Sequence, residues 1–335
     1  MLWINPVFRE FTMKLQQLRY IWEVTNNQFN ISRTSRHLYT SQPGMSKQIR
    51  NLEKELGLDI FVRNGKHLSS LTPAGEKIVA TAGEVLHRVE SIQSIAEEFT
   101  DENLGSLGIA TTHTQSRYIL PEVIKAFIDR YPDVSLHMHQ GTPMQISRLA
   151  ADGTADFAIA TEALELFNDL VMMPCFRWNR TILVPRNHPL CQVSRLTLED
   201  VAKWPIVTYV YGFTGRSKLD EAFQKAALDP KVVFTAVDAD VIKTYVRLGL
   251  GIGILASMAV EENDEDLLAI DASHLFDYST TSIGFRRETF IRKYMYEFIE
   301  MFAPHLDRDR VDAAVERHGQ SGAEDVFRDM EIPFK

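Results

Sequence analysis

The stretch ISRTSRHLYTSQPGMSKQIRNLEKELG, residues 31–57, determines how the rest of the chain is interpreted. It consists of two short helical patterns separated by a tight break, which is typical of a helix-turn-helix. In the second pattern the apolar residues recur at steps of four, three and four, so one face of the helix is buried and the other is free. These apolar residues are Met45, Ile49, Leu52 and Leu56.

The second helix has local signals at both ends. Ser41 is a candidate N-cap and Gly57 a candidate C-cap, and Pro43 is tolerated in the first turn because the amide that it lacks would have no partner there. On the free face, the amide of Gln42 matches the edge of adenine. The other side chains of this face suit guanine or phosphate, and they are Ser46, Lys47 and Arg50. The same pattern also fits a helical hairpin with a solvated, charged face.

Two strand patterns follow around Asn64 and Gly65, a dipeptide that favours a β-hairpin. We interpret this hairpin as a wing that directs Arg63, Lys66 and His67 toward phosphate or the minor groove. A basic hairpin that is merely exposed to solvent is the alternative.

A long helix is predicted from Thr72 and Pro73 onward, and its apolar residues alternate steps of four and three. They are Ile78, Ala82, Val85, Val89, Ile92, Ala96 and Phe99. A seam of this length has no expected partner within its own head domain, which indicates pairing between two chains. The alternative is packing on the second domain of the same chain.

The run SQPGMSKQIRNLEKELGLDIFVR resembles the DNA-reading signature of LysR-type transcriptional regulators. In that signature Ser-Gln-Pro opens the recognition helix, and Leu-Glu, Leu-Gly and Ile-Phe-x-Arg follow at fixed spacing. The residues predicted to contact DNA are Ser41, Gln42, Pro43, Ser46, Lys47, Arg50, Arg63 and Lys66. One departure is that Thr34 and Ser35 stand where the family has two alanines, so their hydroxyls must find backbone partners.

The net charge of −9 is unevenly distributed. Residues 13–72 contain nine Lys or Arg against four Asp or Glu, a net charge of +5, which leaves −14 for the rest. A basic head on an acidic body suits a protein whose head alone contacts DNA phosphates. The two cysteines, Cys175 and Cys191, form no disulfide framework and fit a reducing cytoplasm. We find no secretion signal or membrane span, and we assign no function to residues 1–12.

From Leu104 onward, strand patterns alternate with helical patterns, which indicates an α/β fold with mainly parallel strands. The resemblance implies an effector domain similar to periplasmic binding proteins, with a ligand cleft between two subdomains. We predict a winged helix-turn-helix at 13–71, a linker and dimerisation helix at 72–101, an effector domain at 102–303 and a C-terminal tail at 304–335. Within the effector domain, subdomain I would comprise about 104–176 and 281–303, and subdomain II about 177–280.

Two turns between a strand and a helix are candidate anion sites. Residues 109–117 (IATTHTQSR) and residues 209–217 (YVYGFTGRS) each place hydroxyl groups and free backbone amides at a helix start. Simple capping of the helix N-terminus is the alternative for both turns.

The stretches TTHTQSRY, CFRWNR and YGFTGRS resemble the branch of LysR-type regulators that controls cysteine biosynthesis and sulfur assimilation. The resemblance implies a regulator rather than an enzyme, without a cofactor, that takes a small anionic effector such as sulfate, thiosulfate or acetylserine. The implied pocket residues are Thr112, Thr114, Gln115, Glu162, Trp178 and Thr214. Because Glu162 does not suit a bare anion, we predict that it accepts a hydrogen bond from an amino-acid-like ligand.

The resemblance also implies promoter DNA, further copies of the chain in a homodimer or homotetramer, and RNA polymerase as partners, with no membrane. A regulator of sulfonate or sulfate-starvation genes, or of a pathway with another small acid, is the alternative. An enzyme or transport-type binding protein with a basic extension would need a catalytic constellation or an export signal, and we find neither in the sequence.

Three other features are given structural interpretations. His137 and His139 share one face of a strand but have no evident third ligand, so we expect no metal site. Cys175 is expected to be an inert, buried thiol. We interpret the set Asp238, Asp240, Lys243 and Arg247 as a helix start followed by a solvated face, with a helix that borders the cleft as the alternative.

Overall fold

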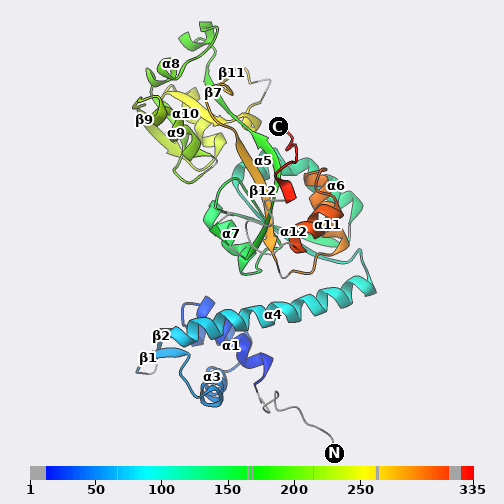
Figure 1. The fold of residues 1–335 in the computed structure, drawn as a ribbon. Coiled ribbons are helices and arrows are strands. Elements are labelled where there is room, and N and C mark those ends of the chain that lie inside the picture. Colours follow the sequence, from blue (N-terminus) through cyan, green and yellow to red (C-terminus); the bar gives the residue numbers. More distant parts are fainter. Residues whose placement is uncertain are drawn as a thin grey trace, which may run out of the picture. The chain divides into compact units, whose positions relative to one another are not determined.

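The computed structural model describes residues 13–335 except 66, 164–165, 168, 214, 262–263, 288 and 317–325 (Figure 1). The chain divides into two compact units, Met1–Ile95 and Ala96–Lys335, and each is described by itself.

The first unit is a winged helix-turn-helix, as predicted. Its elements are α1 (Leu15–Asn26), α2 (Ile31–His37), α3 (Gln42–Leu56), the antiparallel strands β1 (Phe61–Asn64) and β2 (His67–Leu71), and the start of α4 (Pro73–Thr100). The predicted apolar face of α3 is confirmed, because Met45, Ile49 and Leu52 are buried against Ile21 and Val24 of α1. The recognition helix is therefore held by its inner face only.

The predicted local signals around α3 are confirmed. The Ser41 hydroxyl accepts the Gly44 amide at 3.2 Å, and Gly57 ends the helix in the left-handed region at φ +73°. Thr34 and Ser35 stand where the family has two alanines, and their hydroxyls make hydrogen bonds with backbone carbonyls. Thr34 donates to the Asn30 carbonyl at 2.8 Å and Ser35 to the Ser32 carbonyl at 3.1 Å.

The apolar seam of α4 divides into a buried and an exposed half. Ala82 is buried in the core of the first unit and Ile78 packs against that core, so the expectation that the seam has no partner in its own head is wrong for this half. In the first turns of α4 these side chains already face the core formed by α1, α3 and the two strands. Farther along, Ile92 is 66% exposed and Phe99 is 88% exposed.

The start of α4 is pressed against the chain that precedes the wing. Thr72 donates its hydroxyl to the Asp59 carbonyl at 2.7 Å and caps the Gly75 amide at 2.9 Å. A Cβ on Gly75 would lie 2.0 Å from the backbone oxygen of Ile60. Only glycine allows this approach without displacing one of the two backbones.

We therefore expect Gly75→Ala to lower the free energy of unfolding of the first unit by about 2 kcal/mol, as overpacking against backbone does. Urea unfolding monitored by circular dichroism measures the change. The neighbouring Ala74 is exposed, and Ala74→Ser is the matched control with an expected change within about 0.5 kcal/mol. A Gly75→Ala protein as stable as this control would contradict the close packing.

The second unit contains two five-stranded sheets. The first, in the order β4-β3-β5-β12-β6, consists of β3 (Gly105–Thr111), β4 (Val134–Gln140), β5 (Phe157–Ala160), β6 (Leu170–Trp178) and β12 (Ser279–Arg286). The second, in the order β11-β7-β10-β8-β9, consists of β7 (Arg180–Pro185), β8 (Ile206–Tyr209), β9 (Val232–Ala236), β10 (Ile252–Ala256) and β11 (Leu267–Asp271). The α/β fold class is confirmed.

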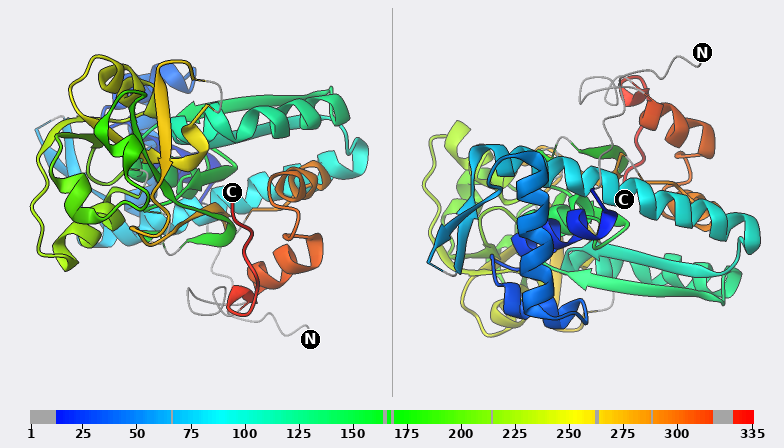
Figure 2. Two further views of the ribbon diagram at one scale, coloured as in Figure 1. Left: turned by 90° about the horizontal axis from the view of Figure 1, so that it is seen from above. Right: turned by 90° about the horizontal axis from the view of Figure 1, so that it is seen from below.

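Helices cover both sheets (Figures 1 and 2). Those near the first sheet are α5 (His113–Tyr118), α6 (Leu120–Arg130), α7 (Pro143–Ala151), α11 (Lys293–Phe302) and α12 (Arg308–Glu316). Those near the second sheet are α8 (Leu198–Ala202), α9 (Arg216–Lys225) and α10 (Ala239–Arg247), with 3₁₀ turns η2 (Pro189–Gln192) and η3 (Ser257–Ala259).

The prediction of mainly parallel pairing is wrong in part, because both sheets are mixed. In the first sheet β12 runs against β5 and β6, and in the second β7 runs against β10 and β11. The chain passes from the first sheet to the second through β6 and β7, and it returns in β12. The strand that arrives from the other sheet is the reversed strand in each case.

The C-terminal residues pack on the first sheet. Helix α12 lies beside α11 (Figure 2). Phe327 and Ile332 are buried. The Arg177 amide of β6 donates to the Pro333 carbonyl at 2.8 Å, and the Lys335 amide donates to the Arg177 carbonyl at 2.9 Å. The described part of the segment predicted as a tail therefore continues the core and pairs with the edge of β6.

Candidate DNA interface and effector cleft

The predicted base-reading face of α3 is open to solvent. Gln42, Pro43, Lys47 and Arg50 are exposed and Ser46 is half-buried, on the side opposite the packed residues. Ser41 is used as the N-cap, so its hydroxyl fixes the start of the recognition helix. The arrangement can place amide, hydroxyl and cationic groups in a major groove.

Arg63 has a partner inside the head that the sequence analysis did not predict. Its guanidinium is paired with the buried carboxylate of Glu53, and it lies 3.5 Å from Asp59. Glu53 also accepts the Ile60 and Phe61 amides at 3.0 and 3.3 Å. The Leu-Glu and Phe-x-Arg parts of the signature thus fasten the wing to the recognition helix. The contact of Arg63 with DNA stays a prediction, and Lys66 lies outside the described residues.

Base contacts and phosphate contacts should separate in binding experiments. We expect Gln42→Ala to relax the base preference, since the side chain is exposed on the reading face. Lys66→Ala should instead weaken all DNA sites alike and flatten the salt dependence by about one unit. Titration of matched and mismatched duplexes at several salt concentrations distinguishes them. Equal loss of discrimination in both variants would contradict this division.

In the second unit, two predicted effector residues, Gln115 and Trp178, come together around a residue that the sequence analysis missed. Thr281 of β12 accepts a hydrogen bond from Gln115 Nε2 and another from Trp178 Nε1, each at 3.1 Å. Its hydroxyl also lies 3.3 Å from the hydroxyl of Thr161. Another predicted effector residue on this turn, Thr114, is buried next to Gln115 at the start of α5.

The polar atoms of this turn are not all used by the fold. Gln115 Oε1 is buried and has no hydrogen-bond partner among the described residues. Thr112 occupies the N-cap position of α5, yet its side chain makes no capping hydrogen bond. The alternative of simple capping by Thr112 is therefore not what the structure shows. A turn with free polar groups is suited to bind a ligand.

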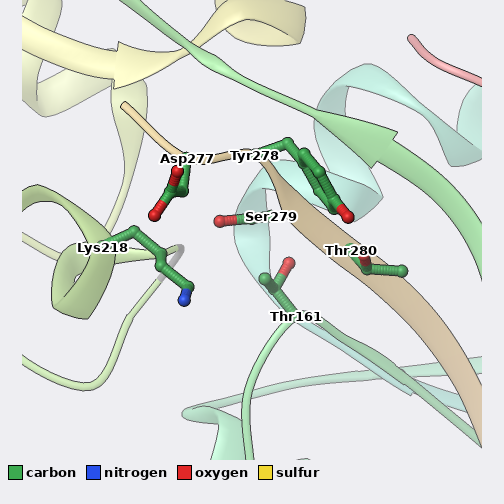
Figure 3. A pocket seen from close by; sticks show the side chains of 6 residues that line it. All are labelled: Thr161, Lys218, Asp277, Tyr278, Ser279 and Thr280. Carbon is green, nitrogen blue, oxygen red and sulfur yellow. The ribbon is translucent and has the colours of Figure 1, made fainter. Parts of the chain in front are cut away.

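A pocket of about 450 Å³ adjoins this cluster. Figure 3 shows Lys218 of α9 facing Thr161 and Ser279 across it. Among the residues that the structure describes, the pocket is lined by Thr161, Lys218, Asp277, Tyr278, Ser279 and Thr280. Thr161 belongs both to the pocket and to the Thr281 cluster, so the two are continuous.

Glu162 makes a hydrogen bond within the protein that links the two sides of the cleft. One carboxylate oxygen accepts the Gly215 amide from the loop before α9. The guanidinium of Arg180, which is 3% exposed, donates to the Gly215 carbonyl, to Ser279 Oγ at 2.9 Å and to the Asp277 carbonyl at 2.9 Å. Burial lowers the pKa of Arg180 to about 10, although the negative charge of Glu162 acts to raise it. Arg180 therefore stays cationic at neutral pH. Thr214, the remaining predicted residue, lies outside the described residues.

A second polar cluster holds the far end of α5. Tyr118 donates to Asp240 Oδ1 at 2.6 Å, and Lys243 Nζ lies 2.8 Å from Tyr118 and 3.0 Å from both Asp240 and Glu261. Burial alone would lower the pKa of Lys243, but the hydrogen bonds to Tyr118, Glu261 and Asp240 raise it.

The interpretation of Lys243 as part of a solvated face is wrong, because its side chain is only 4% exposed. The helix start is confirmed, since the Asp238 carboxylate accepts the Val241 amide at 2.8 Å. Helix α5 thus carries predicted effector residues at one end and is attached to α10 at the other.

The buried thiol predicted for Cys175 is confirmed, and the expectation for His137 and His139 stays a prediction. Cys175 is buried, and burial raises the pKa of its thiol. Within the described ranges, no group of three or more His, Cys, Asp and Glu side chains is placed to hold a metal ion. No helix in the described part of the chain is long and apolar enough to cross a membrane.

The chain belongs to the LysR family of bacterial regulatory helix-turn-helix proteins. Residues 15–76 match the family model of the bacterial regulatory helix-turn-helix protein, lysR family, and residues 100–307 match the LysR substrate binding domain. The protein is a DNA-binding transcriptional regulator, and the expectation of a regulator rather than an enzyme is confirmed by this membership.

Two curated relatives are similar over nearly the whole chain. Identity is 54% over 323 residues with the HTH-type transcriptional regulator CysB of Haemophilus influenzae, covering 96% of this chain and 100% of that protein. It is 48% over 300 residues with the HTH-type transcriptional regulator SsuR of Burkholderia cenocepacia, covering 89% and 97%. The solved cofactor-binding domain of the Cbl transcriptional regulator superposes with a TM-score of 0.61 at 48% identity, covering 63% of this chain and 93% of that one.

Proposed function

We propose that this regulator controls genes of sulfur assimilation and cysteine biosynthesis in response to a small anion bound in the cleft of its second unit. The similarity to CysB, SsuR and Cbl supports the pathway. The observation that carries the effector site is the cluster of Gln115, Trp178 and Thr281 beside the open start of α5. The protein acts in the cytoplasm, where its promoters are.

The chemistry of the cleft suits an oxyanion. Thr112 and Thr114 offer hydroxyl donors, and Trp178 supplies an apolar wall. Lys218 supplies a cation at the rim of the adjoining pocket. The proposed contact residues are Thr112, Thr114, Gln115, Glu162, Trp178 and Thr214, and the proposed ligands are sulfate, thiosulfate and acetylserine.

We propose that ligand binding alters DNA binding by changing how copies of the chain assemble. The exposed half of the α4 seam, with Ile92 and Phe99, supports a homodimer whose two heads read an inverted repeat. A ligand that binds one arrangement of the two sheets better than another shifts the population of that arrangement. Through a homotetramer this shift changes the spacing or bend of promoter DNA and its presentation to RNA polymerase.

Calorimetry of the full-length protein with each of the three ligands tests the effector assignment. Binding of at least one of them, weakened by Gln115→Leu, is the expected result. If none binds while the cysteine-biosynthesis promoter is still bound, the effector assignment fails and the regulator stands.

Glu162→Gln distinguishes an amino-acid-like ligand from a bare anion. Glutamine keeps an oxygen for the Gly215 amide but removes the negative charge. We expect the affinity for acetylserine to fall about fivefold, as for loss of a charge-assisted hydrogen bond. Sulfate and thiosulfate should bind unchanged or more tightly because a like charge is gone. Unchanged acetylserine binding would remove Glu162 from the ligand contacts.

The alternative is control of sulfonate or sulfate-starvation genes. It stands as the second candidate because the chain is similar to SsuR and Cbl, at 48% identity each, as well as to CysB. Deletion of the gene, followed by growth on sulfate and on a sulfonate as sole sulfur source, separates the two. Loss of growth on the sulfonate alone would replace the first proposal by the second.

A further inference from the structure

The end of α4 is attached to the rest of the second unit by Arg292, whose side chain is only 4% exposed. Its guanidinium donates from Nη1 to the Glu97 carboxylate and from Nε to the Glu98 carboxylate, each at 3.0 Å. Its Nη2 donates to the Asp101 carbonyl at 3.1 Å. All three acceptors lie in the last turn of α4 or directly after it, in the same compact unit as Arg292. One buried side chain thus holds the end of the helix at three points.

Glu98 also caps the start of α11. Its other carboxylate oxygen accepts the Lys293 amide, the first amide of that helix, at 3.2 Å. The Arg292 side chain makes no capping hydrogen bond, and the first turn of α11 contains no acidic residue of its own. Amides at a helix N-terminus lack partners within the helix, so Glu98 supplies from α4 the cap that α11 lacks. The last turn of α4 is therefore an integral part of the second unit.

The start of β3 lies directly against this junction. The Tyr294 hydroxyl donates to the Ser106 carbonyl at 3.0 Å, and the Arg292 guanidinium lies 4.9 Å from the centroid of the Tyr294 ring. A Cβ on Gly105 would lie 2.9 Å from Arg292 Nη1 and 2.9 Å from the Tyr294 hydroxyl. The first strand of the second unit is thus held in contact with the same arginine that holds α4.

The two strands that reach this junction also carry the effector cluster at their other ends. Strand β3 begins beside Arg292 and ends at Thr111, where the effector turn follows. Strand β12 carries Thr281 near its start and ends at Arg286, shortly before Arg292. Because β3 runs parallel to β5 and β12 runs antiparallel to it, the effector cluster lies at one edge of the sheet and the junction at the opposite edge.

We propose that Arg292 transmits ligand binding in the cleft to α4, an inference that rests on the proposed function. Helix α4 is continuous over Pro73–Thr100, and its first turns belong to the core of the DNA-binding head. A ligand that shifts β3 and β12 shifts Arg292 with them, and its three hydrogen bonds make the end of α4 follow. A planar guanidinium with forked donors suits this role because it fixes direction as well as distance. Arg292 is thus a positioning residue, which acts without contacting ligand or DNA.

The test compares the full-length wild-type protein with Arg292→Met, which loses the forked donors and keeps much of the volume of the stem. Calorimetry measures the affinity for sulfate, thiosulfate and acetylserine, and promoter titrations measure DNA affinity with and without each ligand. We expect ligand affinity and ligand-free promoter affinity to stay at their wild-type values, while the ligand-induced change in promoter affinity disappears. A side chain that only stabilised the fold would not separate these quantities. Arg195→Met, at an exposed arginine of the second unit, is the matched control and should keep all three.

Hydrogen exchange tests the junction without any ligand. In Arg292→Met the amides of residues 97–104 should exchange about tenfold faster, as for loss of a hydrogen bond to a charged group, while those of α1 keep their wild-type rates. Arg292→Lys keeps the charge but not the fork and is measured in the same way if the methionine variant does not fold. Unchanged exchange at residues 97–104 would overturn the attachment of α4.

The wild-type protein separates failure of this inference from failure of the proposed function. If none of the three ligands changes its promoter affinity, the proposed function fails and the role of Arg292 fails with it. If the wild-type protein responds and Arg292→Met responds equally, the proposed function stands and only the role of Arg292 is overturned. Loss of ligand affinity in Arg292→Met would also overturn it, because the residue would then support the site itself.

Discussion

Arg180→Met is expected to lower the free energy of unfolding of the second unit by about 3 kcal/mol, the scale for breaking a buried charged network. The substitution leaves the Gly215 carbonyl and Ser279 without the Arg180 donor and removes the positive charge of Arg180 from the neighbourhood of Glu162. Methionine preserves much of the volume of the arginine stem, so the loss reports on polar contacts rather than on a cavity.

Urea unfolding of the full chain, followed by tryptophan fluorescence, measures the effect. Arg180→Lys, which keeps the charge but not the forked donors, should lose less and remains measurable if the methionine variant does not fold. Lys203→Met, at the exposed lysine that follows α8 and pairs with Asp200, is the matched control with an expected change within about 0.5 kcal/mol. A methionine variant as stable as this control would show that the bridge to Gly215 does not hold the cleft.

Lys243→Met is expected to cost about 2 to 3 kcal/mol and to weaken ligand binding as well. It removes the buried cation that joins the exposed carboxylates of Asp240 and Glu261, of which Asp240 keeps Arg117 at 3.6 Å, and it removes the donor to Tyr118. Because α5 joins this cluster to Thr114 and Gln115, loosening its far end should disorder the effector turn.

Two measurements on the same protein check this expectation, namely urea unfolding and calorimetry with thiosulfate. Tyr118→Phe should produce a smaller loss of about 1 kcal/mol. Lys125→Met, at an exposed position of α6, should change neither quantity. Unaltered thiosulfate affinity in a clearly destabilised Lys243→Met protein would mean that the cluster supports the fold but not the site.

Features that depend on neighbouring residues in the sequence could be predicted. The Ser41 cap, the Gly57 stop and the hairpin at Asn64 are each determined within a few residues. The apolar period of α3 showed which face is free, and that face holds the proposed base contacts. The family resemblance also predicted that the second unit is a binding domain with two subdomains.

Features that depend on distant parts of the chain could not be predicted from local patterns. The reversed strands β7 and β12 follow from the two passages between sheets, which strand patterns do not reveal. Thr281 lies 166 positions from Gln115, and a threonine in a strand shows no sign of accepting two hydrogen bonds. Lys243 and Arg180 are residue types that usually lie at the surface, and only the tertiary fold buries their side chains beside hydrogen-bond acceptors.

The most direct test of the account is the binding isotherm of the full-length protein on a cysteine-biosynthesis promoter at fixed salt, with and without sulfate, thiosulfate and acetylserine. We predict that at least one ligand shifts the affinity or the mobility of the complex. In Thr281→Val, which removes the hydroxyl shared by Gln115 and Trp178, the ligand-free affinity should persist and the shift should disappear. An unshifted wild-type isotherm, or an equal shift in Thr281→Val, would contradict the claim that an anion in this cleft controls DNA binding.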